Sequence, residues 1–111
     1  MRTDIASIAR IVTPIAEKYG VERVSLFGSR ARGDAGADSD YDFLIADGEI
    51  KSLFTFAAFL TDLEDAFHSP VDLITDSFSD REFLENIQQE AVPLYERQRQ
   101  ANTGKNPEIL R

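Results

Sequence analysis

Two aspartates separated by one residue are the strongest candidates for chemistry in this chain. Asp40 and Asp42 stand at the start of an apolar run, residues 41–46, which has the composition of a β-strand covered on both faces. Side chains at positions i and i+2 of a strand point to the same face, about 6–7 Å apart. Two carboxylates at that spacing can share a pair of hard cations. Mg²⁺ fits such a site because it prefers oxygen ligands and keeps water and phosphate in its shell.

A third aspartate lies in a similar setting. Asp72 is inside the apolar run 71–75, and neither this run nor 41–46 contains Lys or Arg. A buried carboxylate without a partner is costly, so we expect a shared metal to compensate both charges. If the two strands are neighbours, about 4.8 Å separates their backbones and Asp72 reaches the same ions. Two simpler interpretations remain open: a solvated strand start for Asp40 and Asp42, and a water-facing sheet edge for Asp72.

A Gly-Ser pair marks a candidate phosphate site. Gly28 and Ser29 follow the β-rich run 23–27 and precede a charged, loop-like segment, 30–39. Glycine permits positive φ and close backbone approach to a ligand, and backbone N–H groups at such a turn bind phosphate oxygens. We therefore predict that Gly28 and Ser29 bind nucleotide phosphates, with Arg30 and Arg32 supplying positive charge. The alternatives are a tight turn at Gly28 and arginines that are only solvated.

The two blocks together resemble a known signature. Residues 28–33 read Gly-Ser-Arg-Ala-Arg-Gly, and after five further residues 39–42 read Ser-Asp-Tyr-Asp before an apolar strand. With a third carboxylate on a later strand, this pattern is similar to that of the DNA polymerase β-like nucleotidyltransferase superfamily, above all its minimal (MNT) members. The resemblance implies an α/β (α+β) fold with a small mixed sheet flanked by helices. It also implies transfer of a nucleoside monophosphate from an NTP, with ATP as the expected donor, and release of pyrophosphate.

Roles for the site residues follow from the same resemblance. Asp40 and Asp42 would hold two Mg²⁺ ions, and Gly28 and Ser29 would bind the β- and γ-phosphates. Asp72 would bind the metal that activates the acceptor hydroxyl and would help to remove its proton. All three aspartates would thus be catalytic metal ligands.

The resemblance also implies a partner. Minimal members often resemble the antitoxin of bacterial toxin–antitoxin pairs, whose neighbour is a HEPN-domain RNase that some of them adenylylate on a tyrosine. We expect this chain to act in that way. One alternative is a non-catalytic antitoxin that senses nucleotide and neutralises its partner by binding, which the complete set of aspartates disfavours. The other is an antibiotic-type small-molecule nucleotidyltransferase, which the absence of an acceptor-binding segment after residue 96 disfavours.

Composition limits the possible partners and compartment. The net charge of −8 over 111 residues disfavours nucleic acid and favours a basic protein partner. The chain has no cysteine, which excludes disulfides and Cys-based zinc sites and indicates a cytoplasmic protein. No apolar run approaches the ~20 residues that span a bilayer, and the N-terminus lacks the apolar region of a secretory signal. We therefore expect no membrane association.

Periodicity predicts the elements that must position these residues. Apolar residues at helical spacing predict a helix over 4–19, which Gly20 ends. Pro14 either kinks this helix or opens a second one capped by Thr13. Strands are predicted at 23–27, 41–46 and 71–75, and at 92–95 as an edge strand because of Pro93. Ser79 and Glu82 have the spacing of a capping box that starts another helix.

The predicted helix over 51–67 carries more apolar surface than one stripe needs. Its main stripe consists of Leu53, Phe56, Ala57, Leu60, Leu63 and Phe67. Phe54 and Phe59 lie off this stripe, so we expect a second buried face against another element or a partner. His68, at the helix end, is expected at the surface. The domain is predicted over 1–96, followed by a polar, flexible tail, 97–111, whose apolar pair Ile109-Leu110 could dock on a partner.

Overall fold

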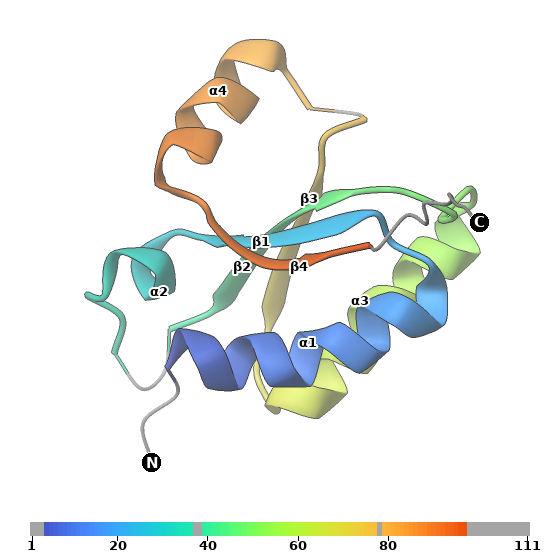
Figure 1. Cartoon of the computed structure of the whole chain (residues 1–111), viewed down its shortest axis with the longest axis horizontal. Coiled ribbons are helices and arrows are strands. Elements are labelled where there is room, and N and C mark those ends of the chain that lie inside the picture. The colour runs from blue at the N-terminus through green and yellow to red at the C-terminus, as the bar shows by residue number, and fades with distance from the viewer. Residues whose placement is uncertain (1–3, 37–38, 78, 98–111) are drawn as a thin grey trace, which may run out of the picture.

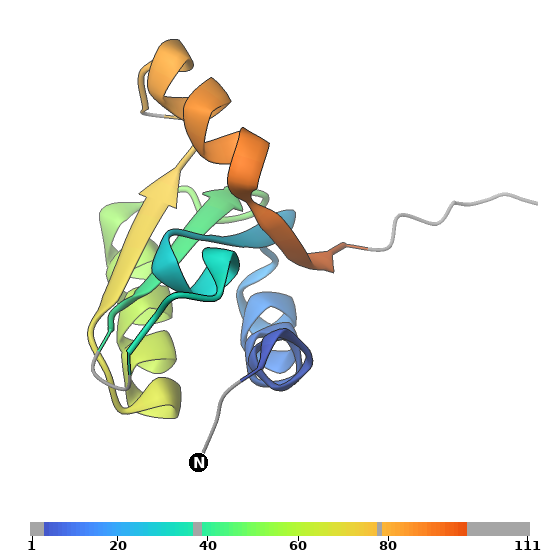
Figure 2. The ribbon, with the colours of Figure 1, turned by 90° about the vertical axis from the view of Figure 1, so that its left-hand side faces the viewer.

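A computed structural model of the chain describes residues 4–36, 39–77 and 79–97. A four-stranded sheet with strand order β3-β2-β1-β4 forms its centre; β2 and β3 are parallel and the other pairs antiparallel. Helices α1 and α3 lie side by side on one face, and α4 lies beyond the other (Figures 1 and 2). The predicted small mixed sheet flanked by helices is therefore confirmed. In chain order the elements are α1 (Ile5–Tyr19), β1 (Arg23–Phe27), α2 (Ser29–Arg32), β2 (Tyr41–Ala46), α3 (Leu53–Phe67), β3 (Val71–Thr75), α4 (Arg81–Glu90) and β4 (Val92–Glu96).

Helix α1 runs unbroken through its proline. The Asp4 side chain caps the helix by accepting the Ser7 N–H at 2.8 Å, and Gly20 ends it in the left-handed conformation with φ 69°. Pro14 lies inside the same helix, so of the two predicted alternatives the second helix capped by Thr13 is wrong. The Thr13 hydroxyl instead donates to the Ala9 carbonyl at 2.7 Å, one turn back along α1.

Helix α3 buries most of the predicted stripe: Leu63 and Phe67 lie in the core, and Phe56 and Leu60 pack against it. Phe59 is fully buried and meets the Tyr19 ring of α1 edge-on, with 5.4 Å between ring centroids. Another element therefore covers the second face expected at Phe59. Leu53 and Phe54, in contrast, are 83% and 91% exposed. The helical period alone does not set the angle at which α3 meets the sheet, which is why Leu53 was wrongly assigned to the core.

The two faces of the sheet are covered unequally. Alternate residues of β2, namely Tyr41, Phe43 and Ile45, face α1 and α3 in the buried core. Asp42 faces the other way and is only half-buried, and Asp72 of β3 is exposed. The expectation of strands covered on both faces was therefore wrong at these two positions. Helices α1 and α3 pack on one side of the sheet (Figure 2). Asp42 and Asp72, on the other side, remain partly open to water.

Two local predictions also need correction. The segment expected to be a loop from residue 30 begins inside a short helical turn, α2. Asp80, rather than Ser79, caps α4 by accepting the Phe83 N–H at 3.2 Å, while the Ser79 hydroxyl donates to the Thr75 carbonyl. Aspartate and serine are both good N-caps, and the turn after β3 selects between them. The edge position of β4, predicted from Pro93, is confirmed.

The end of the described chain is attached to the sheet region. The Arg97 N–H donates to the Glu22 carbonyl at 2.9 Å, and its guanidinium pairs with Glu49 at 2.7 Å. Residue 97, predicted as the first of the tail, is thus bonded to the domain. The rest of the predicted tail, 98–111, including Ile109-Leu110, lies outside the described residues. None of the helices in the described ranges has the length and apolar character needed to traverse a bilayer.

Candidate active site

Strand pairing places two of the three predicted aspartates side by side, and the third lies at the same end of the sheet. Asp42 and Asp72 are partners in the parallel register of β2 and β3, so their side chains lie next to each other on the same face. The Tyr41 N–H donates to the Pro70 carbonyl at 3.2 Å, which closes the ladder at its first rung. Asp40 precedes β2 by one residue and is exposed. The carboxylates therefore gather where β2 and β3 begin.

The surroundings of Asp42 disfavour the ionised form of its carboxyl group. Burial raises the pKa of the Asp42 carboxyl above its ordinary value, and the nearby charges of Asp72 and Asp40 raise it further. Arg32 and Arg30 oppose this rise by a smaller amount. Like charges that disfavour one another's ionised form have a strong attraction for a cation.

As the side chains stand, the aspartates do not form a closed metal cage. Within the described ranges, no three His, Cys, Asp or Glu side chains converge closely enough to hold one ion. Asp42 and Asp72 lie side by side on neighbouring strands, and Asp40 lies at the same end of β2, so the three carboxylates share one region of the molecule.

Gly28 packs directly against Asp42. Phe27, the last residue of β1, pairs with Asp42, and Gly28 follows with φ 77° and ψ −157°, a conformation that glycine alone adopts readily. A Cβ atom at Gly28 would lie 3.1 Å from the Asp42 carboxyl carbon and closer still to one of its oxygens. The need for glycine predicted from the sequence thus has a steric cause. Ser29 then begins α2, whose first turn uses the Gly28 carbonyl as acceptor for Ala31 and Arg32.

Both predicted phosphate arginines have partners within the chain. Arg30 donates to the Ser39 carbonyl at 2.7 Å, and its guanidinium carbon lies 3.9 Å from the centre of the Tyr41 ring. Arg32 pairs with Asp34 at 3.3 Å and with Glu90 of α4 at 3.0 Å. Their contact with phosphate stays a prediction. The contact of Arg30 with Tyr41 was missed because the alternation of β2 identifies Tyr41 only as a core residue.

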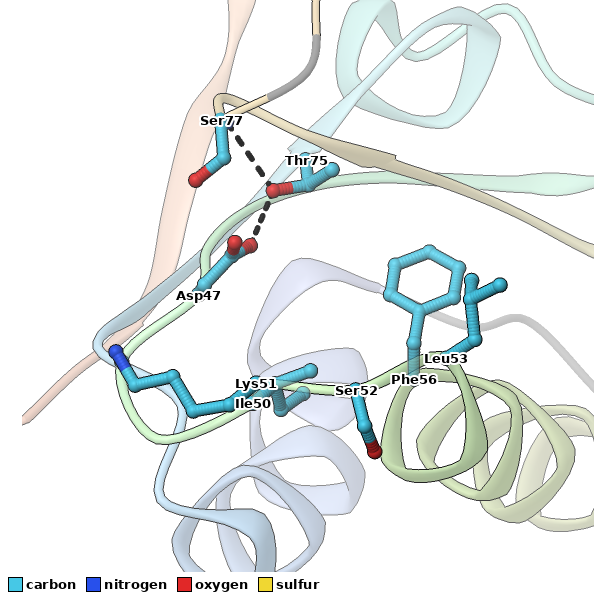
Figure 3. Close-up of a pocket in the computed structure, with 9 residues that line it drawn as sticks. Asp47, Ile50, Lys51, Ser52, Leu53, Phe56, Thr75 and Ser77 are labelled. Atoms are coloured by element: carbon cyan, nitrogen blue, oxygen red, sulfur yellow. Dashed lines mark hydrogen bonds between the residues drawn. The ribbon is translucent and has the colours of Figure 1, made fainter.

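A pocket lies at the opposite end of β2 and β3. It has a volume of about 670 Å³, and Figure 3 shows its lining near Asp47, Phe56 and Thr75. The Thr75 hydroxyl donates to the Asp47 carboxylate across the two strand ends and accepts the Ser77 N–H. Five residues of strand place this pocket roughly 17 Å from Asp42. None of the predicted site residues lines it, so we assign the chemistry to the aspartates and not to this pocket.

Comparison with known proteins decides the family. The family model described as "Polymerase beta, Nucleotidyltransferase" matches residues 10–100, which include every residue of the candidate site. The chain belongs to this nucleotidyltransferase family. The sequence prediction of the superfamily from residues 28–33 and 39–42 is therefore confirmed.

Two curated relatives extend the comparison. "Putative protein adenylyltransferase MJ0435" of Methanocaldococcus jannaschii is 40% identical over 72 residues, covering 65% of this chain and 77% of the relative. "Protein adenylyltransferase MntA" of Thermococcus cleftensis is 40% identical over 63 residues, covering 57% of this chain and 64% of the relative. This nucleotidyltransferase is thus similar to proteins named for transfer of adenylyl groups to protein.

Solved structures share the fold. One described as "putative minimal nucleotidyltransferase" has a TM-score of 0.72 and 31% identity, covering 84% of this chain and 98% of that one. A toxin–antitoxin structure with AMP-PNP has a TM-score of 0.70 at 17% identity, covering 81% and 74%. A tri-AMPylated HEPN toxin of Shewanella oneidensis in complex with MNT antitoxin has a TM-score of 0.63 at 14% identity, covering 81% and 71%. At these last two identities, the likeness describes the fold alone.

Proposed function

We propose that this nucleotidyltransferase moves AMP from ATP to a hydroxyl of a partner protein, a tyrosine of a HEPN-type toxin, and thereby acts as an antitoxin. The observation that carries the proposal is the juxtaposition of Asp42 with Asp72 and Gly28. It places paired carboxylates beside a backbone segment that only glycine can form. The names of the 40%-identical relatives support protein as the acceptor.

The residues at the site fit Mg²⁺. Asp40, Asp42 and Asp72 offer only oxygen donors, and because burial and the neighbouring carboxylates raise the pKa of Asp42, a bound cation would favour its ionised form. In the proposal Asp40 and Asp42 would hold two ions, and Asp72 would hold one of them. Bound Mg²⁺ supplies stabilisation for the charge that builds on the phosphate oxygens during transfer.

The chain's own residues supply position and proton transfer. The backbone at Gly28 and Ser29, with the Ser29 hydroxyl, holds the β- and γ-phosphates so that the α-phosphate faces the aspartates. The acceptor's phenol oxygen bonds to the α-phosphorus as the bond from that phosphorus to the β-phosphate oxygen breaks. Pyrophosphate leaves, and the phenol proton passes to the Asp72 carboxylate. The exposure of Asp72 is compatible with an acceptor that arrives from another protein.

The surface offers a place for such a partner. Leu53 and Phe54 are largely exposed at the start of α3, and Leu53 lines the pocket together with Ile50 and Phe56. Exposed adjacent apolar side chains of this size are typical of protein interfaces. The net charge of −8 adds long-range attraction to a basic partner. We propose that the toxin packs on this apolar start of α3.

One experiment tests the function. The full chain is purified with the protein encoded beside its gene, given Mg²⁺ and each NTP in turn, and both proteins are weighed by mass spectrometry. We expect the partner to gain adenylyl groups from ATP with the wild type and none with Asp42→Asn. A partner neutralised with no gain in mass would support the binding-only antitoxin. Transfer to a small molecule with no protein partner recovered would support the antibiotic-type enzyme.

A further inference from the structure

Arg30 makes its contacts inside the molecule, at the segment that carries two of the aspartates. One of its terminal nitrogens donates to the Ser39 carbonyl at 2.7 Å. Its guanidinium lies over the Tyr41 ring, with 3.9 Å from the guanidinium carbon to the ring centre. Ser39 and Tyr41 are the immediate neighbours of Asp40, and Tyr41 also precedes Asp42. Arg30 therefore contacts the residues on both sides of Asp40.

Tyr41 connects these contacts of Arg30 to the hydrophobic core. Its side chain is 5% exposed and contacts Phe67 of α3, with 4.3 Å between the ring centroids. The backbone of Tyr41 is held by the Pro70 carbonyl at the start of β3. A cation stacked on a ring that is itself fixed in the core has little freedom to turn away. At the other end, Arg30 belongs to α2, which begins one residue after Gly28.

The local chemistry suits an internal role better than a phosphate contact. A guanidinium that stacks on an aromatic face and donates in its own plane uses the two properties that distinguish Arg from Lys. The Arg30 Nε atom is buried and has no hydrogen-bond partner among the described residues, so this edge of the group is turned away from bulk water. Arg32, by comparison, is exposed and forms ion pairs with the surface carboxylates of Asp34 and Glu90.

We infer that Arg30 is a positioning residue: by clamping Ser39 and Tyr41 it fixes Asp40 and Asp42 relative to the Gly28-Ser29 turn, and it does not bind phosphate itself. This inference rests on the proposed function, because it assigns Arg30 an effect on the metal-binding carboxylates. Groups that orient metal ligands from behind alter metal affinity or activity by about 10–100-fold when they are lost. Arg30→Lys keeps the charge and removes both the planar stack and the fork.

The decisive experiment measures metal and nucleotide binding separately on the full chain. Mn²⁺ serves as the metal probe, titrated without nucleotide and followed by electron paramagnetic resonance, and AMP-PNP is titrated in EDTA by calorimetry. We expect Arg30→Lys to weaken Mn²⁺ binding about tenfold, while AMP-PNP affinity stays within about twofold. Tyr41→Phe, which keeps the ring, should bind Mn²⁺ like the wild type. Arg10→Lys on α1 controls for a generic Arg-to-Lys change. A loss of AMP-PNP affinity with unchanged Mn²⁺ affinity would make Arg30 a phosphate ligand and overturn the inference.

A metal-independent measurement separates this inference from the proposed function. Amide hydrogen exchange at Tyr41 and Asp42 should be faster in Arg30→Lys by about tenfold and unchanged in Arg10→Lys, because the clamp no longer resists local opening. Wild-type protein that binds no Mn²⁺ would refute the metal-dependent function. The exchange rates would still test whether Arg30 holds Ser39 and Tyr41 in place. Unchanged exchange in Arg30→Lys would overturn the clamp whether or not metal binds.

Discussion

At the scale of single residues, the candidate site contains groups that are unfavourable for the folded chain. Asp42 is half-buried beside two other carboxylates, so its ionised form is disfavoured in the folded chain. Gly28 leaves room for that carboxylate and adopts a backbone conformation closed to other residues. An unfavourably placed charge and a restricted backbone of this kind are common at functional sites.

The first residue-scale prediction concerns Asp42→Asn. Because the folded-state pKa of Asp42 is raised, its contribution to stability is full below the unfolded pKa of about 3.9 and is lost as pH rises through the folded pKa. We therefore expect the metal-free variant to melt at a higher temperature than wild type at pH 7 and at the same temperature near pH 3. Transfer activity should be abolished. Circular dichroism melts at the two pH values and the transfer assay measure both effects.

The exposed Asp65→Asn change on α3 is the control for removal of one negative charge from this acidic chain. It should leave the transfer activity intact. A wild-type level of transfer by Asp42→Asn would refute the metal assignment. A lower melting temperature for the variant at pH 7 would show that the Asp42 charge stabilises the fold.

The second residue-scale prediction concerns Gly28→Ala. The added methyl group would strike the Asp42 carboxylate, and alanine would be forced to positive φ. We expect a loss of about 1–3 kcal/mol in the free energy of unfolding and loss of AMP-PNP binding. Urea denaturation and calorimetry provide the measurements. Gly36→Ala is the matched control, because a Cβ at Gly36 meets nothing within 4 Å. Unchanged nucleotide affinity in Gly28→Ala would make this turn purely structural.

At the scale of elements, helix caps and sheet edges determine where each element begins. Asp4, Ser52 and Asp80 cap the three long helices with their side chains. The short α2 turn begins directly after Gly28, which packs against Asp42. Pro93 is tolerated because β4 occupies an edge of the sheet. These features fix where each element starts and therefore which residues meet at the site.

The element-scale prediction concerns the end of α3. His68, found at the helix end as expected, adopts the left-handed conformation with φ 54° and donates its N–H to the Glu64 carbonyl at 2.8 Å. Glycine adopts this conformation without strain, so His68→Gly should raise the free energy of unfolding by about 0.5–1 kcal/mol. Urea denaturation measures the change. Ser69→Gly is the control and should give no gain; an equal gain there would show that the effect does not come from the cap.

At the scale of the whole molecule, the chemistry and the exposed apolar surface lie apart. The aspartates stand where β2 and β3 begin, and the pocket with Leu53 and Phe54 lies where these strands end. A bound protein large enough to cover the start of α3 must therefore extend along the sheet to reach Asp72.

The whole-molecule prediction concerns Phe54→Ser. Phe54 is 91% exposed and makes no contribution to the core, so the variant should fold normally. We expect its affinity for the proposed protein partner to fall at least tenfold, because buried aromatic side chains dominate protein interfaces. Affinity should also fall as salt is added, as the charge of −8 requires. Surface plasmon resonance measures both. Phe83→Ser on α4 is the matched control; a larger loss there would place the partner on α4.

The sequence by itself determined the family and most of the elements. Patterns of period 2 and 3.6 are local, so they located β1, β2, β3 and the helices α1 and α3 nearly to the residue. The spacing within residues 28–33 and 39–42 likewise identified the nucleotidyltransferase before any strand was paired. These features depend on side chains close together in the chain, and local sequence records such proximity directly.

Only the tertiary structure decided what each side chain faces. Helices α1 and α3 both pack on one side of the sheet, and this leaves Asp72 exposed and Asp42 half-buried where the apolar runs predicted burial. The parallel register that sets Asp42 beside Asp72 joins residues 30 positions apart, and no local pattern encodes it. The same holds for Arg30 on Tyr41 and for exposed Phe54. Burial and pairing depend on how elements dock, and docking minimises the free energy of the whole chain at once.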